Sequence, residues 1–236
     1  MRILVTNCNT TEAMTKEIEA GARAAASPGT EILALTPKWG PESAEGWLDS
    51  FLSAAAVLDL LRTTEEPFDA VVLAGFGEHG REGARELLDV PVVDITEAAA
   101  HLAGLLGRRY GVVTTLDRTC GLIEDSLHSA GVDRNCVAVV GTGLSVLELR
   151  DEERTESALL AAGLRARDAG AEVLVLGCAG MTGLDRKMSA MLDVPVVDGV
   201  AAAVRLAESL VALGLRTSRA GSYARPLEKH RAWPGE

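Results

Sequence analysis

Short apolar runs rich in β-branched residues alternate along the chain with longer segments whose apolar residues recur at helical spacing. The short runs predict strands at 3–6, 31–35, 70–74, 90–93, 110–114, 137–140, 172–177 and 194–197. The longer segments predict helices at 11–26, 44–62, 81–88, 97–106, 118–130, 147–169 and 199–213. Runs such as AVVLA and VLVLG contain no polar residue, as is typical of strands covered by helices on both faces. The pattern therefore predicts an α/β fold with parallel strands.

An internal repeat divides the chain into two related halves. The segment LDVPVVD occurs at 88–94 and again at 192–198, and each copy follows a strand that ends in a glycine-rich turn. A weaker match pairs ILVTNCNTT at 3–11 with GVVTTLDRT at 111–119. Two such halves are expected to face each other about a pseudo-twofold axis, with their strand-end loops forming one cleft. We therefore expect two pseudo-symmetric parallel-sheet α/β lobes with the active site in the cleft between them.

The repeat also predicts where the lobes divide. We expect residues 1–97 and 199–213 to form the first lobe, and residues 98–198 to form the second. Helical periodicity is lost after residue 213, so we expect 214–236 to be a mobile C-terminal tail.

Composition narrows the class of function. The 236 residues are 47% hydrophobic, enough for a substantial core, and the formal net charge is −11. A negative chain with only 3% aromatic residues is a poor partner for nucleic acid. The sequence shows neither a cleavable leader nor an apolar run long enough for a membrane span, so we expect a cytoplasmic protein without a membrane partner. A small-molecule enzyme is favoured.

Four cysteines carry the candidate chemistry. Their spacing predicts neither a metal site nor a disulfide framework, so each is interpreted as a free thiol. Cys178 lies at a strand end between glycines, where backbone N–H groups favour negative charge and lower a thiol pKa, so we interpret it as a proton-transfer group. Aligning the two glycine-rich turns pairs Gly75 with Cys178. Cys8, Cys120 and Cys136 lack this combination and are interpreted as packing residues.

Several segments together resemble a known family. The start MRILVTNCNTT is similar to that of the hydantoin and allantoin racemases of the aspartate/glutamate racemase superfamily, which usually have Asn-Pro-Asn-Thr where this chain has NCNT at 7–10. GPESAEGWLD at 40–49 resembles their Gly-Pro-x-Ser-Ile-Glu-Gly segment, and VVTTL at 112–116 and LGCAGM at 176–181 also match. The resemblance extends along nearly the whole chain up to the tail.

The resemblance implies a cofactor-independent racemase that acts on 5-monosubstituted hydantoins. In that family two cysteines on opposite faces of the stereocentre exchange a proton with carbon C5, and Cys178 matches the second of them. The first would lie where this chain has Gly75, which implies a chain that is inactive or acts on one face only. A homo-oligomer is expected on the same ground.

The resemblance also implies which residues bind substrate. Asn9, Thr10, Thr11 and Ser43 would hold the hydantoin ring, although such residues also serve as helix caps and turn residues. Donors for the enolate oxygen would come from the hydroxyls of Thr114 and Thr115 and from the turns containing Phe76, Gly77, Ala179 and Gly180. Bulky apolar 5-substituents are expected to be accepted, because four large apolar residues are expected beside the 5-substituent, namely Trp39, Trp47, Phe76 and Met181.

Other interpretations remain open. GFGEHG at 75–80 fits a dinucleotide-binding fingerprint, with Asp94 following at the expected distance, although the repeat explains Asp94 more simply as a structural residue. A decarboxylase of the same superfamily would need a single thiol, and a binding protein would need none. Allantoin is an alternative substrate within the family. Glu78 or His79 is an alternative source of the second base.

Overall fold

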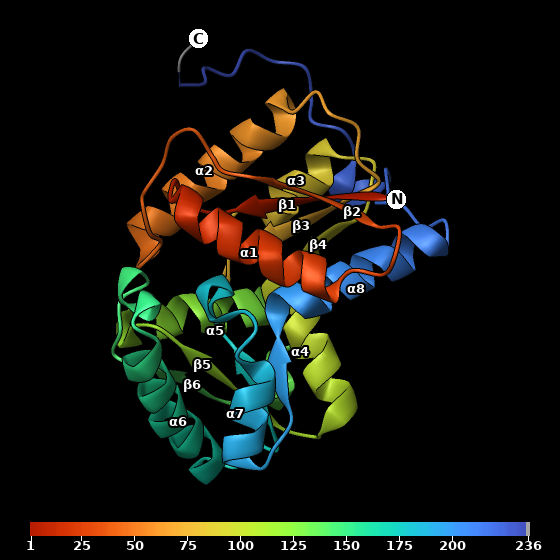
Figure 1. Ribbon diagram of the computed structural model, residues 1–236. Helices are drawn as coiled ribbons and strands as arrows, with labels where there is room; N and C mark the ends of the chain where they lie inside the picture. The colour runs from red at the N-terminus through yellow and green to blue at the C-terminus, as the bar shows by residue number, and fades with distance from the viewer. Residues whose placement is uncertain (235–236) are drawn as a thin grey trace.

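The computed structural model describes residues 1–234 and contains two four-stranded sheets whose strands are all parallel (Figure 1). The first sheet has the order β2-β1-β3-β4 and the second has the equivalent order β6-β5-β7-β8. Their bounds are β1 Arg2–Asn7, β2 Glu31–Leu35, β3 Ala70–Ala74, β4 Val92–Asp94, β5 Tyr110–Thr114, β6 Cys136–Gly141, β7 Val173–Leu176 and β8 Val196–Asp198. The identical strand order confirms the predicted α/β fold with two related parallel sheets.

Helices flank both sheets (Figure 1). Their bounds are α1 Glu12–Ala25, α2 Trp47–Thr63, α3 Arg81–Leu87, α4 Ile95–Leu106, α5 Cys120–Ser129, α6 Glu152–Asp168, α7 Asp185–Leu192 and α8 Gly199–Ala212. The helix predicted at 147–169 is divided, because Asp151 caps a new helix by accepting a hydrogen bond from the backbone N–H of Arg154. Helix α7 was not predicted, since only Met188 and Leu192 are buried along its eight residues.

In each half the repeated LDVPVVD segment ends a strand and caps the helix that follows it. Asp94 ends β4 and accepts hydrogen bonds from the backbone N–H groups of the first turn of α4. Asp198 ends β8 and caps α8 in the same way. Asp94 is also only 1% exposed, so it is not accessible to a nucleotide ribose. The structure therefore gives Asp94 the structural role that the repeat predicted.

The two helices that follow these segments cross between the halves. Helix α4 follows the first sheet but packs on β7 and β8 of the second, whereas α8 follows the second sheet and packs on β3 and β4 of the first. The two helices also contact each other, and one buried cluster includes residues of both sheets, such as Val72 and Val175. Because the lobes share this core, the boundaries at 97 and 198 stay a prediction.

The C-terminal segment lies against the first lobe. The backbone N–H and the hydroxyl of Thr217 donate to the carbonyls of Asp89 and Val90, at 3.1 and 2.6 Å. Arg219 forms an ion pair with Asp89, and the Tyr223 hydroxyl donates to the carboxylate of Glu82. The mobility expected for 214–236 stays a prediction. These contacts, with the ion pair of Arg225 and Asp89, argue against it for residues 217–225. Residues 235–236 lie outside the described residues.

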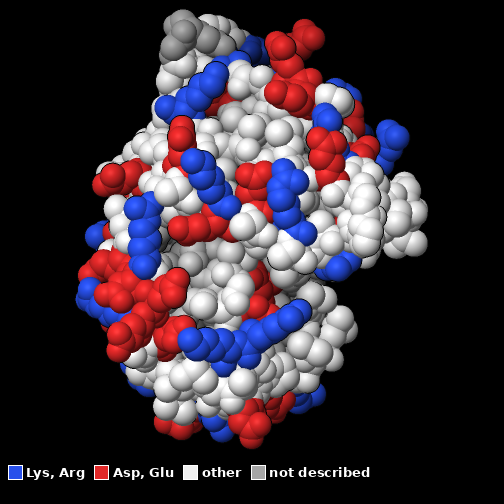
Figure 2. Space-filling view, viewed as in Figure 1, with Lys and Arg blue, Asp and Glu red and all other residues white. Residues whose placement is uncertain are grey.

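The surface carries charges of both signs. Figure 2 shows Lys and Arg side chains interspersed with Asp and Glu side chains over both lobes on the face displayed. Among the helices of residues 1–234, none has the length and apolar character needed to cross a membrane.

Candidate active site

A cavity of about 40 Å³ lies where the carboxyl ends of the middle strands of both sheets meet. In the first sheet the chain proceeds from β1 to β2 on one side and then crosses to β3 on the other, so the crevice between β1 and β3 is a topological switch point. The same holds for β5 and β7. The cavity wall includes residues that end or follow these four strands, namely Asn7, Cys8, Asn9, Ala74, Gly75, Phe76, Thr114, Thr115, Gly177, Cys178 and Ala179.

The strand register makes Gly75 and Cys178 equivalent positions. Leu73 of β3 pairs with the capping aspartate of β4, and Leu176 of β7 pairs with the capping aspartate of β8. Gly75 and Cys178 each follow two residues after these leucines. Both line the cavity, one from each lobe. The structure therefore brings together the two positions that the repeat had paired.

The Cys178 thiol has a raised pKa. Burial is the largest cause, and it raises the pKa of Cys178 to about 11 although the backbone N–H of Gly180 lowers it by hydrogen bonding. The carboxylates of Glu45 and Glu17 raise it further. The expectation that the turn would lower this pKa was therefore wrong, because one backbone donor does not compensate for desolvation.

Gly75 is surrounded by two side chains of its own lobe. A Cβ atom at this position would lie 2.6 Å from Cys8 Cβ, 2.9 Å from Cys8 Sγ and 2.5 Å from His79 Cδ2. Burial raises the pKa of Cys8 to about 12 and lowers that of His79 to about 4. Both groups are therefore neutral near pH 7. Cys8 was predicted to be a packing residue; it belongs to a buried apolar cluster with Leu4 and Leu73, and it also lies in the cavity wall.

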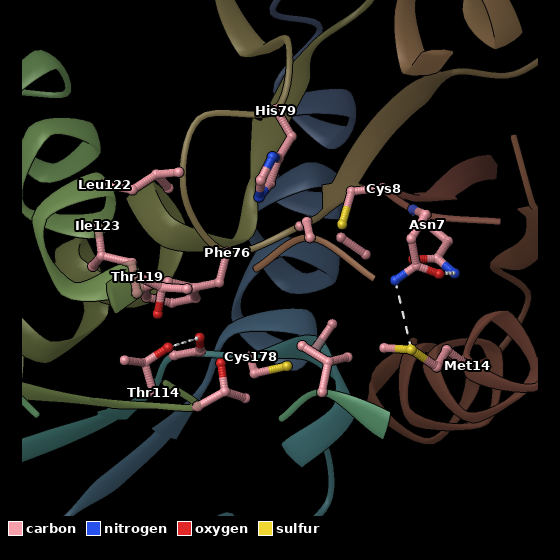
Figure 3. Close-up of a pocket in the computed structure, with 18 of the residues that line it drawn as sticks. Asn7, Cys8, Met14, Phe76, His79, Thr114, Thr119, Leu122, Ile123 and Cys178 are labelled. Carbon is pink, nitrogen blue, oxygen red and sulfur yellow. Dashed lines mark hydrogen bonds between the residues drawn. The ribbon is translucent and has the colours of Figure 1, made fainter. Parts of the chain in front are cut away.

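Asn9 presents an amide group to the cavity. Its Oδ1 accepts hydrogen bonds from Asn7 Nδ2 at 2.9 Å and from the Thr11 backbone N–H at 3.0 Å. Its Nδ2 donates to the sulfur of Met14 at 3.5 Å, the contact drawn as the dashed line that ends at Met14 in Figure 3. Since a thioether is a weak acceptor, this N–H can turn to a ligand carbonyl at small cost.

The threonines predicted as enolate donors differ in their freedom to donate. Thr114 and Thr115 both line the cavity. The Thr114 hydroxyl already donates to the carbonyl of Gly177 at 3.1 Å, so it offers a ligand its oxygen lone pair and not its proton. Thr114 is therefore the weaker candidate, and Thr115 stays a predicted enolate donor beside the backbone N–H groups of the glycine-rich turns.

Several residues expected at the site lie outside the cavity wall. Thr10 and Thr11 support the neighbouring loop, since the Thr10 backbone N–H donates to the carbonyl of Pro41 at 3.0 Å and the Thr11 hydroxyl donates to that of Glu42 at 2.7 Å. That loop contributes Ala44 and Gly46, but not Ser43, to the wall. Gly77 and Gly180 also lie just outside it. Substrate contact by these residues stays a prediction.

Only one of the four large residues expected beside the substituent lies in the wall. Phe76 lines the cavity, whereas Met181 is fully buried in the core of the second sheet. Trp39 donates its indole N–H to Asp59 at 2.7 Å, and Trp47 is 47% exposed on α2.

Sequence reasoning also missed residues that do form the wall. They are Asn7, Cys8, Met14, Ala44, Gly46, Thr119, Leu122, Ile123 and Val146, and the wall also includes His79, which was considered only as a substitute base. Asn7 ends β1 and Cys8 follows it, so the strand-end rule could have found them. Glu78, the other substitute, lies outside the wall and accepts from the backbone N–H groups of Gly80 and Arg81. Within residues 1–234, no three His, Cys, Asp or Glu side chains are grouped as metal ligands.

Comparison with known proteins identifies the family. Residues 3–207 match the family model described as Asp/Glu/Hydantoin racemase. The chain belongs to this family. It is 41% identical to a hydantoin racemase of Pseudomonas sp., over 97% of this chain and 93% of that one. The crystal structure of an allantoin racemase from Pseudomonas fluorescens superposes with a TM-score of 0.96 at 55% identity, covering 99% of this chain and all of that one. This racemase is therefore an isomerase of the hydantoin and allantoin racemase type.

More distant structures share only the fold. Arylmalonate decarboxylase superposes with a TM-score of 0.61 at 18% identity, covering 91% of this chain and 94% of that one. At this identity the likeness supports the two-lobed architecture and says nothing about the reaction. The single-thiol decarboxylase hypothesis therefore stays a prediction.

Proposed function

We propose that this racemase inverts carbon C5 of 5-monosubstituted hydantoins, with Cys178 as one proton-transfer group. The main support is the position of Cys178, which lines the cavity where the switch points of the two sheets meet. Ligands of open α/β sheets bind at such points. A pseudo-symmetric cavity also offers two opposite faces to a flat ring, as inversion requires.

The chemistry needs only proton transfer. A thiolate takes the C5 proton, so the C–H bond breaks, an S–H bond forms and the electron pair moves into an enolate of the neighbouring carbonyl. A proton donor on the opposite face then forms the new C–H bond. Backbone N–H groups and Asn9 Nδ2 would hold the ring carbonyls and the enolate oxygen. Nothing is oxidised or reduced, so the proposal includes no cofactor.

We propose that the preferred 5-substituent is the ureido group, which makes the substrate allantoin. The chain is 55% identical to the allantoin racemase from Pseudomonas fluorescens and 41% identical to the hydantoin racemase from Pseudomonas sp.. Three of the four large apolar residues expected beside a bulky substituent lie outside the cavity wall, although Phe76, Leu122 and Ile123 line it. The greater identity to the allantoin racemase is therefore the observation that favours the ureido group over the benzyl and isobutyl groups.

The test follows single enantiomers of ureido-, benzyl- and isobutyl-substituted hydantoins by polarimetry, with the spontaneous rate subtracted. The expected result is inversion with the highest kcat/KM for the ureido compound. Loss of at least 100-fold in Cys178→Ser, with Cys136→Ala as a control outside the cavity, would assign the thiol. Inversion absent with all three compounds would refute the proposal, and carbon dioxide release from an arylmalonate would support the decarboxylase. Exchange without inversion would agree with the one-sided activity that Gly75 predicts.

A further inference from the structure

We infer that Cys8 is the second proton-transfer group of this racemase and replaces the cysteine that the family resemblance places at position 75. The inference rests on the proposed function and names the group that works opposite Cys178. It contradicts the prediction that Gly75 leaves the chain inactive or one-sided. Position, space and orientation each support it.

Cys8 lies at the end of the strand next to the one that Gly75 follows. Asn7, the last residue of β1, pairs in register with Ala74, the last residue of β3. Cys8 follows β1 and Gly75 follows β3, so the two residues lie side by side across the switch point. A thiol moved from the end of one strand to the end of its neighbour remains at the same edge of the cavity.

Cys8 and a side chain at position 75 would compete for the same space. A Cβ atom on residue 75 would lie only 2.6 Å from Cys8 Cβ and 2.9 Å from Cys8 Sγ. Gly75 does not have a left-handed φ, in contrast to Gly77 with a φ of +124°. The backbone at 75 would therefore accept any residue, and the room taken by Cys8 and His79 explains the glycine. The thiol at position 8 thus occupies the space that a thiol at position 75 would need.

The two thiols approach the cavity from opposite lobes. Cys8 reaches the cavity from the first lobe and Cys178 from the second, and Figure 3 shows their sulfur atoms on opposite sides of the space between the labelled side chains. They are close enough that negative charge on Cys178 raises the pKa of Cys8. A flat ring between them would have one sulfur on each face, which is the arrangement that inversion needs.

His79 is the competing candidate, and its geometry is less suitable. The ring directs a carbon, Cδ2, toward the position of a Cβ at 75. Its Nδ1 is 3.3 Å from the Ser50 hydroxyl, and the ring also has a hydrogen bond with the backbone of Phe76. His79 therefore lies beside Cys8 with hydrogen-bond partners of its own.

The two thiols complete a balanced cycle. One thiol first loses its proton to water, which leaves a thiolate on one side of the cavity and a thiol on the other. If Cys8 is the thiolate, it takes the C5 proton as the C–H bond breaks, and the S–H bond of Cys178 breaks as a new C–H bond forms on the opposite face. The product is the other enantiomer, and the thiolate is now on Cys178. The reverse direction begins from that state.

The test is hydrogen exchange at C5 in heavy water, followed by NMR for each enantiomer separately, alongside polarimetry. Cys8→Ser and Cys178→Ser are each expected to lose inversion by at least about 100-fold. Each variant should keep exchange with one enantiomer, and the retained enantiomer should differ between the two. Cys136→Ala should behave as the unaltered chain. A variant that merely folds poorly would lose both enantiomers equally, so this mirror-image pattern reports proton transfer itself.

Different results would overturn the role of Cys8 and the proposed function. If the unaltered chain inverts the substrate and Cys8→Ser still does so, this inference is overturned and the proposed function stands. Loss of inversion in His79→Gln would then assign the second base to His79. Exchange without inversion in the unaltered chain would refute both the proposed inversion and the role of Cys8, and would leave Cys178 as a base that acts on one face. Neither exchange nor inversion with any of the hydantoins would overturn the proposed function and this inference with it.

Discussion

Adding one methyl group at position 75 tests the packing on which the role of Cys8 depends. In Gly75→Ala the new Cβ would lie 2.5 Å from His79 Cδ2 and 2.6 Å from Cys8 Cβ, distances that real structures do not sustain. His79 can rotate at its far end, but Cys8 Cβ is fixed to the backbone after β1. Overpacking of this kind costs about 1–3 kcal/mol. Alanine also lowers the conformational entropy of the unfolded chain, which stabilises the folded state by about 0.4–1 kcal/mol. The expected net loss in the free energy of unfolding is therefore about 1–2 kcal/mol.

A double-mutant cycle separates this clash from other effects. In a Cys8→Gly background both contacts with residue 8 disappear, so adding Ala at 75 should cost at least about 1 kcal/mol less. Urea denaturation of the four chains at pH 7 provides the free energies of unfolding. Gly104→Ala is the matched control, because a Cβ there meets nothing within 4 Å, and its helical site should gain about 0.5–1 kcal/mol. Equal costs of Gly75→Ala in the two backgrounds would refute the shared space at 8 and 75.

Three further predictions concern pH and assembly. Burial lowers the pKa of His79 from 6.5 to about 4. The neutral ring therefore contributes about 3 kcal/mol to the free energy of unfolding above pH 6.5, and this contribution is lost as the pH falls from 6.5 to 4. In urea denaturation His79→Gln should lack this acid loss, and an unchanged pH dependence would contradict the prediction. Burial raises the pKa of Cys178 to about 11, so alkylation of its thiol by iodoacetamide, followed by mass spectrometry, should accelerate about tenfold per pH unit between 7 and 9; a plateau below pH 8 would disagree. The homo-oligomer expected from the family resemblance should appear in light scattering at micromolar concentration, where a monomeric mass would exclude it.

The fold could be predicted because its information is local and repeated. Continuous apolar runs specify buried parallel strands, and two copies of LDVPVVD imply two equivalent sheets. Helix α7 escaped prediction because it buries only Met188 and Leu192, too few positions to show a helical period.

The site was predicted less completely, since its composition depends on which strand ends become neighbours. Gly75 and Cys178 could be paired because the repeat aligns them directly. The nearness of Cys8 to Gly75 follows from the pairing of β1 with β3, which the local pattern does not state. Met181 illustrates the opposite error, because a large apolar residue beside a site motif also fits the core, and here the core holds it.

The crossing of α4 and α8 has a consequence for how the chain acquired two halves. Each helix covers the sheet of the other half, so either half alone would expose an apolar sheet face and carry a helix without a surface to cover. A single ancestral half would meet this need by exchanging its final helix with a second copy of itself, as in a domain-swapped dimer. Gene duplication would then join two subunits that already shared a core. Once they were joined, the two cavity edges were free to diverge, and a thiol on one edge could change strands while the other stayed in place.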